Sequence, residues 1–102
     1  MNHNLYFSMN KYSEKELEDN VHLFDSTDWH CISWCQELSE SFVEKYMLDM
    51  DEITWYFISL YQKLSDEFIK KYINKINIDR LIDNKNISNK IKKELRLLKE
   101  II

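Results

Sequence analysis

Leu64-Ser65-Asp66-Glu67-Phe68-Ile69 is the stretch that decides the fold, because its pattern of residue types recurs along the chain. Earlier copies read Leu38-Ser39-Glu40-Ser41-Phe42-Val43 and Tyr12-Ser13-Glu14-Lys15-Glu16-Leu17, and a later copy reads Ile87-Ser88-Asn89-Lys90-Ile91-Lys92. The first three serines follow one another at intervals of 26 residues, and the last follows after 23. The chain is therefore a tandem repeat with a short unit, and such a period is typical of helical repeat proteins.

Each copy has the residue types of a helix start. A serine at the N-cap accepts hydrogen bonds from the backbone N–H groups of the first turn, and an acidic residue after it lies at the positive end of the helix dipole. The apolar residues on either side fit a hydrophobic staple, which pairs Leu38 with Val43 and Leu64 with Ile69. We therefore expect a helix to begin after each serine.

A second helix start precedes the two middle copies. Asp25 and Asp51 lie four residues before Trp29 and Trp55, which fits an N-cap followed by a staple onto the tryptophan. Each unit is thus expected to be a pair of helices. The predicted helices cover roughly 13–24, 26–36, 40–50, 52–62, 66–76, 78–84 and 89–100.

This pattern predicts an all-α protein, a short helical-repeat solenoid of antiparallel helix pairs with about six or seven helices. We expect a single domain over 1–102, with units of roughly 1–24, 25–50, 51–76 and 77–102. Residues 1–10 have neither the cap nor the tryptophan, so we expect a worn half-repeat that covers the open end of the stack. The structural repeat positions are Trp29, Ile32, Leu38, Ser39, Phe42, Tyr46, Trp55, Ile58, Leu64, Ser65, Phe68 and Tyr72.

The composition agrees with helices alone. Glycine and proline are both absent, which leaves Asn, Asp and Ser to end the helices. No period-two alternation is sustained, so strands are not expected. No apolar run approaches the roughly 20 residues of a membrane span, and no signal-peptide pattern is present. We expect an intracellular protein that does not enter a membrane.

The two middle units share the pattern W-x-x-I-S-x-x-Q-x-L-S-[DE]-x-F-[IV]-x-K-Y, once over 29–46 and again over 55–72. This pattern resembles the short tandem helical repeats of uncharacterised proteins from giant DNA viruses and some phages. The resemblance covers the chain from about Tyr12 onward, although Glu16 replaces the phenylalanine in the first unit and Ile78 the tryptophan in the last. It implies a repeat architecture and a viral source, and it implies no catalytic activity.

The candidate metal ligands of the sequence are His22, His30, Cys31 and Cys35. The two cysteines share a helical face at i, i+4, as some zinc sites require. However, Phe57 and Tyr61 occupy the matching places of the next unit, which indicates packing positions, and the spacing is not that of structural zinc. We expect no metal and no other cofactor. A disulfide between the cysteines is disfavoured, because an intracellular chain keeps its thiols reduced.

Polar residues also repeat inside the first helix of each unit, as Ser33 with Ser59 and Gln36 with Gln62. Neither a histidine nor a carboxylate recurs beside them, so they lack the base that a nucleophile needs. We expect the serines to allow close helix approach and the amides to satisfy backbone groups in the turns before Leu38 or Leu64.

Charge is distributed unevenly. The chain carries −4 overall, but residues 70–102 hold ten of the 14 basic residues and carry +6, which leaves −10 on the first 69 residues. The final helix also has more apolar residues than its expected inward stripe of Ile91, Leu95, Leu98 and Ile102. This pattern predicts a surface for an acidic protein or for the acidic end of another copy, although a charge run can also be a solvated face. The predicted partner-binding residues are Lys92, Lys93, Arg96, Leu97, Lys99 and Ile101.

The sequence contains no Gly-rich phosphate loop, no nucleophile beside a base and no recurrent carboxylate pair, so we expect no enzymatic activity. We expect a non-enzymatic, virus-encoded interaction module that binds a host or viral protein in the host cytoplasm. One alternative is a nucleic-acid-associated protein that uses the basic C-terminal third, although Tyr72 is its only aromatic residue for stacking on bases. The other alternative is a self-associating structural component.

Overall fold

The computed structural model describes residues 7–101, and within them the chain is all-helical, with no strand. The all-α class is therefore confirmed. Seven α-helices are joined by short turns, and two of them continue into 3-10 helices. The α-helices are α1 (Glu14–Asn20), α2 (Ser26–Cys35), α3 (Glu40–Tyr46), α4 (Glu52–Tyr61), α5 (Asp66–Lys71), α6 (Ile78–Ile82) and α7 (Asn89–Ile101); the 3-10 helices are η1 (Val21–Leu23) and η2 (Met47–Asp49).

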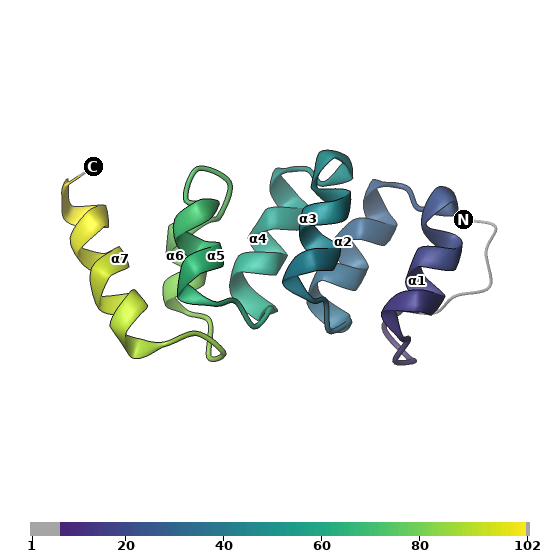
Figure 1. The fold of residues 1–102 in the computed structure, drawn as a ribbon, viewed down its shortest axis with the longest axis horizontal. Helices are drawn as coiled ribbons and strands as arrows, with labels where there is room; N and C mark the ends of the chain where they lie inside the picture. Colours follow the sequence, from purple (N-terminus) through teal and green to yellow (C-terminus); the bar gives the residue numbers. More distant parts are fainter. Residues whose placement is uncertain (1–6, 102) are drawn as a thin grey trace.

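The helices form two layers along a body with dimensions of 45 × 21 × 19 Å (Figure 1). We call α2, α4 and α6 the even layer, and α1, α3, α5 and α7 the odd layer. In the even layer α4 lies between α2 and α6 and packs against both. The turns that lead from an even helix to the next odd helix all lie along the lower edge in Figure 1, and we call this edge the turn edge.

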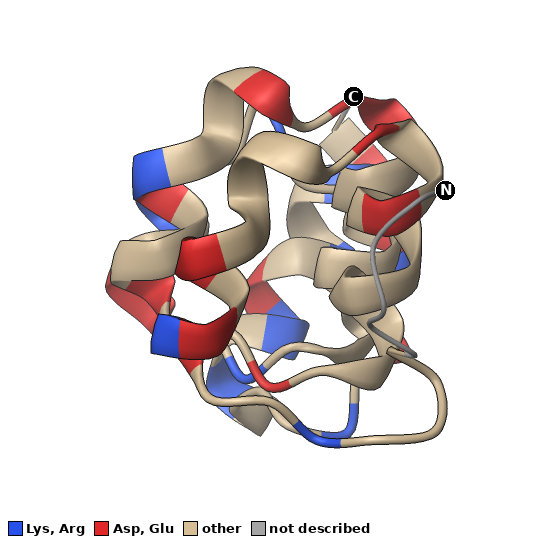
Figure 2. Ribbon diagram, turned by 90° about the vertical axis from the view of Figure 1, so that its right-hand side faces the viewer, with Lys and Arg blue, Asp and Glu red and all other residues tan. Residues whose placement is uncertain are grey.

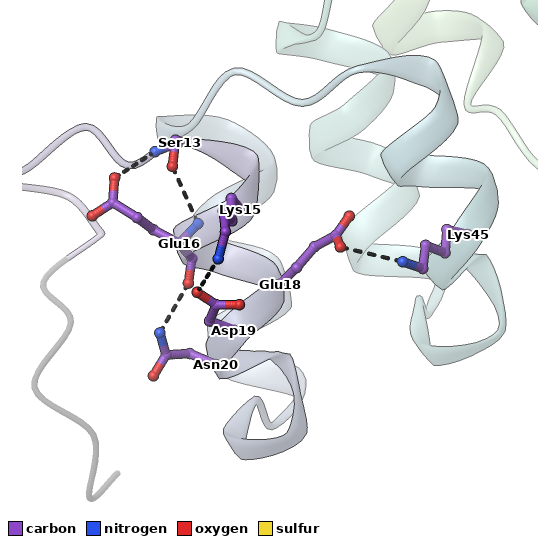
Figure 3. Close-up of polar contacts among 7 residues, drawn as sticks. All are labelled: Ser13, Lys15, Glu16, Glu18, Asp19, Asn20 and Lys45. Carbon is purple, nitrogen blue, oxygen red and sulfur yellow. Dashed lines mark hydrogen bonds and ion pairs between the residues drawn. The ribbon is translucent and has the colours of Figure 1, made fainter.

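The predicted caps explain where these helices begin. The Ser13 hydroxyl accepts from the backbone N–H of Glu16, whose carboxylate in turn accepts from the N–H of Ser13, so the predicted capping box is present (Figure 3). Ser39 and Ser65 cap α3 and α5 in the same way, at 3.1 and 3.2 Å from the third backbone nitrogen of each helix. Asp25 and Asp51 cap α2 and α4, each with an N···O distance of 2.9 Å.

Three odd helices end earlier than the sequence predicts. The helix predicted over 13–24 becomes 3-10 at Val21, and that predicted over 40–50 becomes 3-10 at Met47. The helix predicted over 66–76 ends at Lys71 and continues as turns. A 3-10 turn changes the rise and rotation per residue, and Met50 is buried at its end. Ile76, which follows the turns after α5, is also buried.

The core is a continuous row of aromatic and aliphatic side chains between the two layers. The rings of Trp55 and Phe68 stack with centroids 6.5 Å apart, and their counterparts Trp29 and Phe42 lie 6.1 Å apart. These repeat positions therefore lie where the two helices of a unit pack against each other. The predicted inward stripe of α7 is confirmed at Ile91 and Leu95, which are buried, and Leu98 is half-buried; Ile102 lies outside the described residues.

The segment before α1 covers the N-terminal end of the core without forming a helix. Residues 7–9 form a turn, and Phe7 is buried with its ring 5.4 Å from that of Phe24. This part of the predicted half-repeat thus closes the end of the stack, and residues 1–6 lie outside the described part of the chain. Among residues 7–101, no helix combines the length and the apolar character needed to cross a membrane.

Candidate interaction surfaces

Side-chain amides from three successive units hold the turn edge in place, and we call Gln36, Gln62 and Asn84 the amide ladder. The Gln62 amide donates to the backbone carbonyls of Ser33 and Gln36 at 2.8 and 2.7 Å. Its oxygen accepts from the N–H of Leu38 at 2.9 Å. These partners lie at the end of α2 or in the turn that follows it in the preceding unit, so one buried side chain joins two units. The predicted role is therefore confirmed for Gln62, which serves the turn before Leu38, whereas Gln36 forms hydrogen bonds with the segment before α1.

The same arrangement recurs at both ends of the ladder. Gln36 donates to the carbonyls of Phe7 and Asn10 and accepts from the N–H of Tyr12, so the segment before α1 replaces a complete unit. In the last unit Asn84 donates to the carbonyls of Ser59 and Gln62 at 2.9 and 2.8 Å. Sequence alignment missed Asn84, because the shorter last unit moves it out of register with Gln62.

The odd layer presents charged residues that pair between units. Glu18 accepts from Lys45 at 3.2 Å, and the equivalent Glu44 accepts from Lys71 at 2.9 Å (Figure 3 shows the first pair). Glu44 also accepts from the Tyr72 hydroxyl, and this hydrogen bond, followed by that from Lys71, lowers the pKa of Glu44. These groups are satisfied within the fold, which is typical of a solvated face.

The even layer presents aromatic residues instead. We call Trp34, Ile53, Tyr56, Phe57 and Tyr61, from α2 and α4, the aromatic face; Trp34 is 45% exposed and Tyr61 47% exposed. The Phe57 ring packs edge-on against Tyr56 at 5.3 Å and stacks on Tyr61 at 6.3 Å. Contiguous exposed apolar side chains of this kind mark interaction sites more often than scattered ones do.

The sequence-based prediction does not include this face, because it assigns Phe57 and Tyr61 to packing positions. Phe57 is half-buried, but nearly half of Tyr61 is exposed. One signal was available: α2 has Cys31 and Cys35 where α4 has aromatic residues, whereas the core tryptophans are the same in both units. A position that varies in this way between units is less constrained by the core.

A groove of about 830 Å³ adjoins the aromatic face along the turn edge. Trp34 and Tyr61 line it together with residues from three turns: Lys11, Tyr12, Ser13, Glu14, Cys35, Gln36, Glu37, Leu38, Ser39, Gln62, Lys63 and Asn86. We call it the turn-edge groove. The amides of Gln36 and Gln62 in this groove belong to the ladder. Their hydrogen bonds hold the turns that form the floor of the groove.

The predicted C-terminal surface is divided between two flanks of α7. At 100° per residue, Leu97 and Ile101 fall on the flank of Glu94, which pairs with Lys70 of α5. Lys92 lies on the opposite flank with Lys99, which pairs with Asp79 at the start of α6. Leu97 and Ile101 are 59% and 80% exposed. Arg96 and Lys93 lie between the flanks, on the side away from the body, so the six residues do not form one compact patch.

Three of the candidate metal ligands, His30, Cys31 and Cys35, are engaged in other contacts, and the fourth, His22, is exposed. The Nε2 atom of His30 lies 2.8 Å from both carboxylate oxygens of Asp51, which ties α2 to the N-cap of α4. The Cys35 thiol lies 2.7 Å from the carbonyl oxygen of Cys31, and burial, then the neighbouring Cys31 thiol, raise the pKa of Cys35 to about 12. Among the described residues no three His, Cys, Asp or Glu side chains converge on a metal position.

We expect metal chelation to leave the stability unchanged. A structural zinc would be coupled to folding, whereas packed thiols and a histidine hydrogen-bonded to Asp51 would not respond to EDTA. The measurement is a thermal melt followed by circular dichroism, with and without chelator, on freshly purified protein. Stoichiometric zinc in that protein, or a melting temperature that falls with EDTA, would contradict the packing assignment of Cys31 and Cys35.

Asp51 is expected to make stability depend on pH in the acid range. The hydrogen bond from the Thr54 backbone N–H, with a further contribution from His30, lowers its pKa from 3.8 to about 2. A lowered folded-state pKa stabilises the fold above the unfolded value, and this stabilisation is lost as the pH falls toward 2. The variant Asp51→Asn keeps a capping oxygen but does not titrate here. In urea unfolding, the free energy of the parent should therefore fall more steeply below about pH 4 than that of the variant. Parallel pH profiles would contradict this role.

The chain shows no significant match to any protein family, to any curated protein or to any solved structure.

Proposed function

We propose that the chain is a non-enzymatic interaction module that binds another protein through its even-layer side. The observation that carries this proposal is the contrast between the layers. The odd layer pairs its charges internally, while α2 and α4 expose Trp34, Tyr56 and Tyr61 on neighbouring, directly packed helices. Tryptophan and tyrosine are the residues that most often dominate protein–protein binding energy.

The resemblance of the two middle units to repeats of giant DNA viruses and phages supports a viral source. On that basis we further propose that the partner is a host or viral protein and that the encounter takes place in the host cytoplasm. The C-terminal residues Lys92, Lys93, Arg96, Leu97, Lys99 and Ile101 remain the second candidate surface, because Leu97 and Ile101 are exposed at the end of the body.

Parallel affinity capture from host-cell lysate tests the proposal. Four baits are compared: the parent, the aromatic-face variant Trp34→Ser with Tyr56→Ser and Tyr61→Ser, the α7 variant Lys92→Glu with Lys93→Glu and Arg96→Glu, and an odd-layer control at an exposed residue of α5, Glu67→Lys. Lys99 is left unchanged because its pair with Asp79 belongs to the fold. We expect a protein that the parent and the control retain and that the aromatic-face variant loses.

The comparison separates the candidate surfaces. If only the α7 variant fails to retain the captured protein, the binding site lies at the C-terminal end. Identical retention by all four baits would contradict both surfaces. Circular dichroism of each variant confirms that helical content is unchanged before capture.

A further inference from the structure

The turn-edge groove is formed before any partner binds. Its floor contains Gln36 and Gln62, which are 4% exposed and held by backbone groups of neighbouring turns. Because these amides are fixed, binding would not have to order the floor, and a preformed site loses less conformational entropy than a flexible loop does.

Two aromatic side chains, Trp34 and Tyr61, line the groove and have about half of their surface exposed. Trp34 comes from the end of α2 and Tyr61 from the end of α4, so they belong to successive units. Packed helices lie about 8–10 Å apart, which an extended chain covers in about three residues. A segment in the polyproline II conformation rises about 3.1 Å per residue and completes a turn in three residues, so it would place every third side chain against the groove at about this spacing.

The charges along the groove favour an acidic ligand. The Glu14 carboxylate accepts from the backbone N–H of Ser39 at 2.5 Å, and Glu37 pairs with Lys11 at 3.7 Å. Farther along the turn edge, Glu40 and Asp66 accept from Ser65 and Ser88.

Three other lysines of this edge have no equivalent partners. Lys63 lines the groove, Lys85 and Lys90 are exposed beyond it, and none of the three forms an ion pair within residues 7–101. Figure 2, which looks along the body from its N-terminal end, shows Lys and Arg among the turns of the lower edge, while Asp and Glu lie at the top and also along the left-hand side. The turn edge is thus the side on which acidic groups would meet uncompensated positive charge.

We infer that the turn-edge groove binds an extended acidic segment of another protein with an apolar side chain at about every third residue. The apolar side chains contact Trp34 and Tyr61, and the carboxylates face Lys63 and the lysines beyond it. The inference rests on the proposed interaction function and specifies its partner. A nucleic-acid strand is the competing occupant, because its phosphates would meet the same lysines, and the oligothymidylate probe below tests it.

Fluorescence anisotropy with defined probes tests this inference. The main probe is a labelled dodecapeptide of four tandem Glu-Glu-Phe triplets. The comparison probes are Glu-Glu-Ser triplets, Lys-Lys-Phe triplets and an oligothymidylate of the same length. We expect saturable binding of the Glu-Glu-Phe peptide that weakens with added salt, and at least about tenfold weaker binding of each comparison probe.

Two variants locate the site, and one serves as a matched control. Trp34→Ala and Lys63→Glu should each weaken binding of the main probe about tenfold or more. Lys75→Glu reverses an exposed lysine at the opposite edge and should leave the Kd within about twofold. Circular dichroism shows whether each variant keeps its helical content.

Several results would overturn the inference. The first is that the Glu-Glu-Phe peptide shows no saturable binding. The second is that the Lys63→Glu and Trp34→Ala variants bind this peptide as tightly as the parent does. The third is that the oligothymidylate binds more tightly than the peptide, which would assign the groove to nucleic acid. Self-association of the free protein through Trp34, detected by sedimentation, would assign the groove to a second copy. If the Glu-Glu-Phe peptide does not bind but capture from lysate still depends on the aromatic face, only the proposal of an acidic ligand is contradicted. If both fail, the proposed function fails as well.

Discussion

Replacing Trp55 with alanine is expected to lower the free energy of unfolding by about 3–5 kcal/mol. Trp55 is 5% exposed and lies against the rings of Phe68 and Tyr72, with centroids 6.5 and 6.3 Å away. Alanine removes these contacts and leaves a cavity between two layers that are held apart by their other side chains. The loss is a large part of the roughly 5–15 kcal/mol that stabilises a typical domain. Urea unfolding followed by circular dichroism measures it.

Trp34→Ala is the matched control, because it removes the same side chain from the surface. Trp34 is 45% exposed and lines the groove, so its removal should cost no more than about 1 kcal/mol. Similar losses for the two tryptophans would show that Trp34 contributes to the core, and the aromatic face would then lose its main residue. An unchanged stability of the Trp55 variant would contradict the packing of the two layers.

Gln62→Leu is expected to lower the free energy of unfolding by about 3–6 kcal/mol, although leucine is similar in size and more apolar. The change leaves the carbonyls of Ser33 and Gln36 and the N–H of Leu38 without the partner that satisfies them. Each buried group without a partner costs about 1–3 kcal/mol. The measurement is again the urea unfolding free energy, with helical content recorded at zero denaturant.

The neighbouring change Lys63→Leu provides the control for Gln62. Lys63 is exposed and forms no hydrogen bond or ion pair within residues 7–101, so the change should alter stability by less than about 0.5 kcal/mol. A loss below about 1 kcal/mol for Gln62→Leu would mean that water replaces the amide. The ladder would then be a consequence of the fold and not a cause of its stability.

Much of the helical fold is predictable from local chemistry. Each cap depends on one side chain and a backbone N–H three residues later, so Ser39, Ser65 and Asp51 predict their helices from the sequence. The helix ends are less predictable. No glycine or proline ends them, and no single residue type marks the change to 3-10 geometry after Asn20 and Tyr46.

The surfaces were harder to predict, because burial depends on contacts between units. Trp34 lies outside the repeated tryptophan position, and only the packed layers show that it is exposed. Likewise, Lys92 and Leu97 are close in sequence, but the orientation of α7 places them on different flanks. The pairing of charges along the turn edge is also not predictable from the charge asymmetry of the sequence. Acidic side chains there accept hydrogen bonds from the serines that cap the next helices, whereas Lys63 has no ion pair among the described residues.

The amides of the ladder all form hydrogen bonds toward the N-terminal end of the molecule. Each rung belongs to one unit and holds the turn of the unit before it, so removal of the last unit would release only one turn, whereas removal of a middle unit would divide the stack. Fluctuations that open the protein should therefore begin at the C-terminal end, where among the described residues no later unit supplies an amide to residues 84–88. The helices that carry Trp34 and Tyr61 have neighbours on both sides. A partner bound there would remain attached while the C-terminal unit frays and closes.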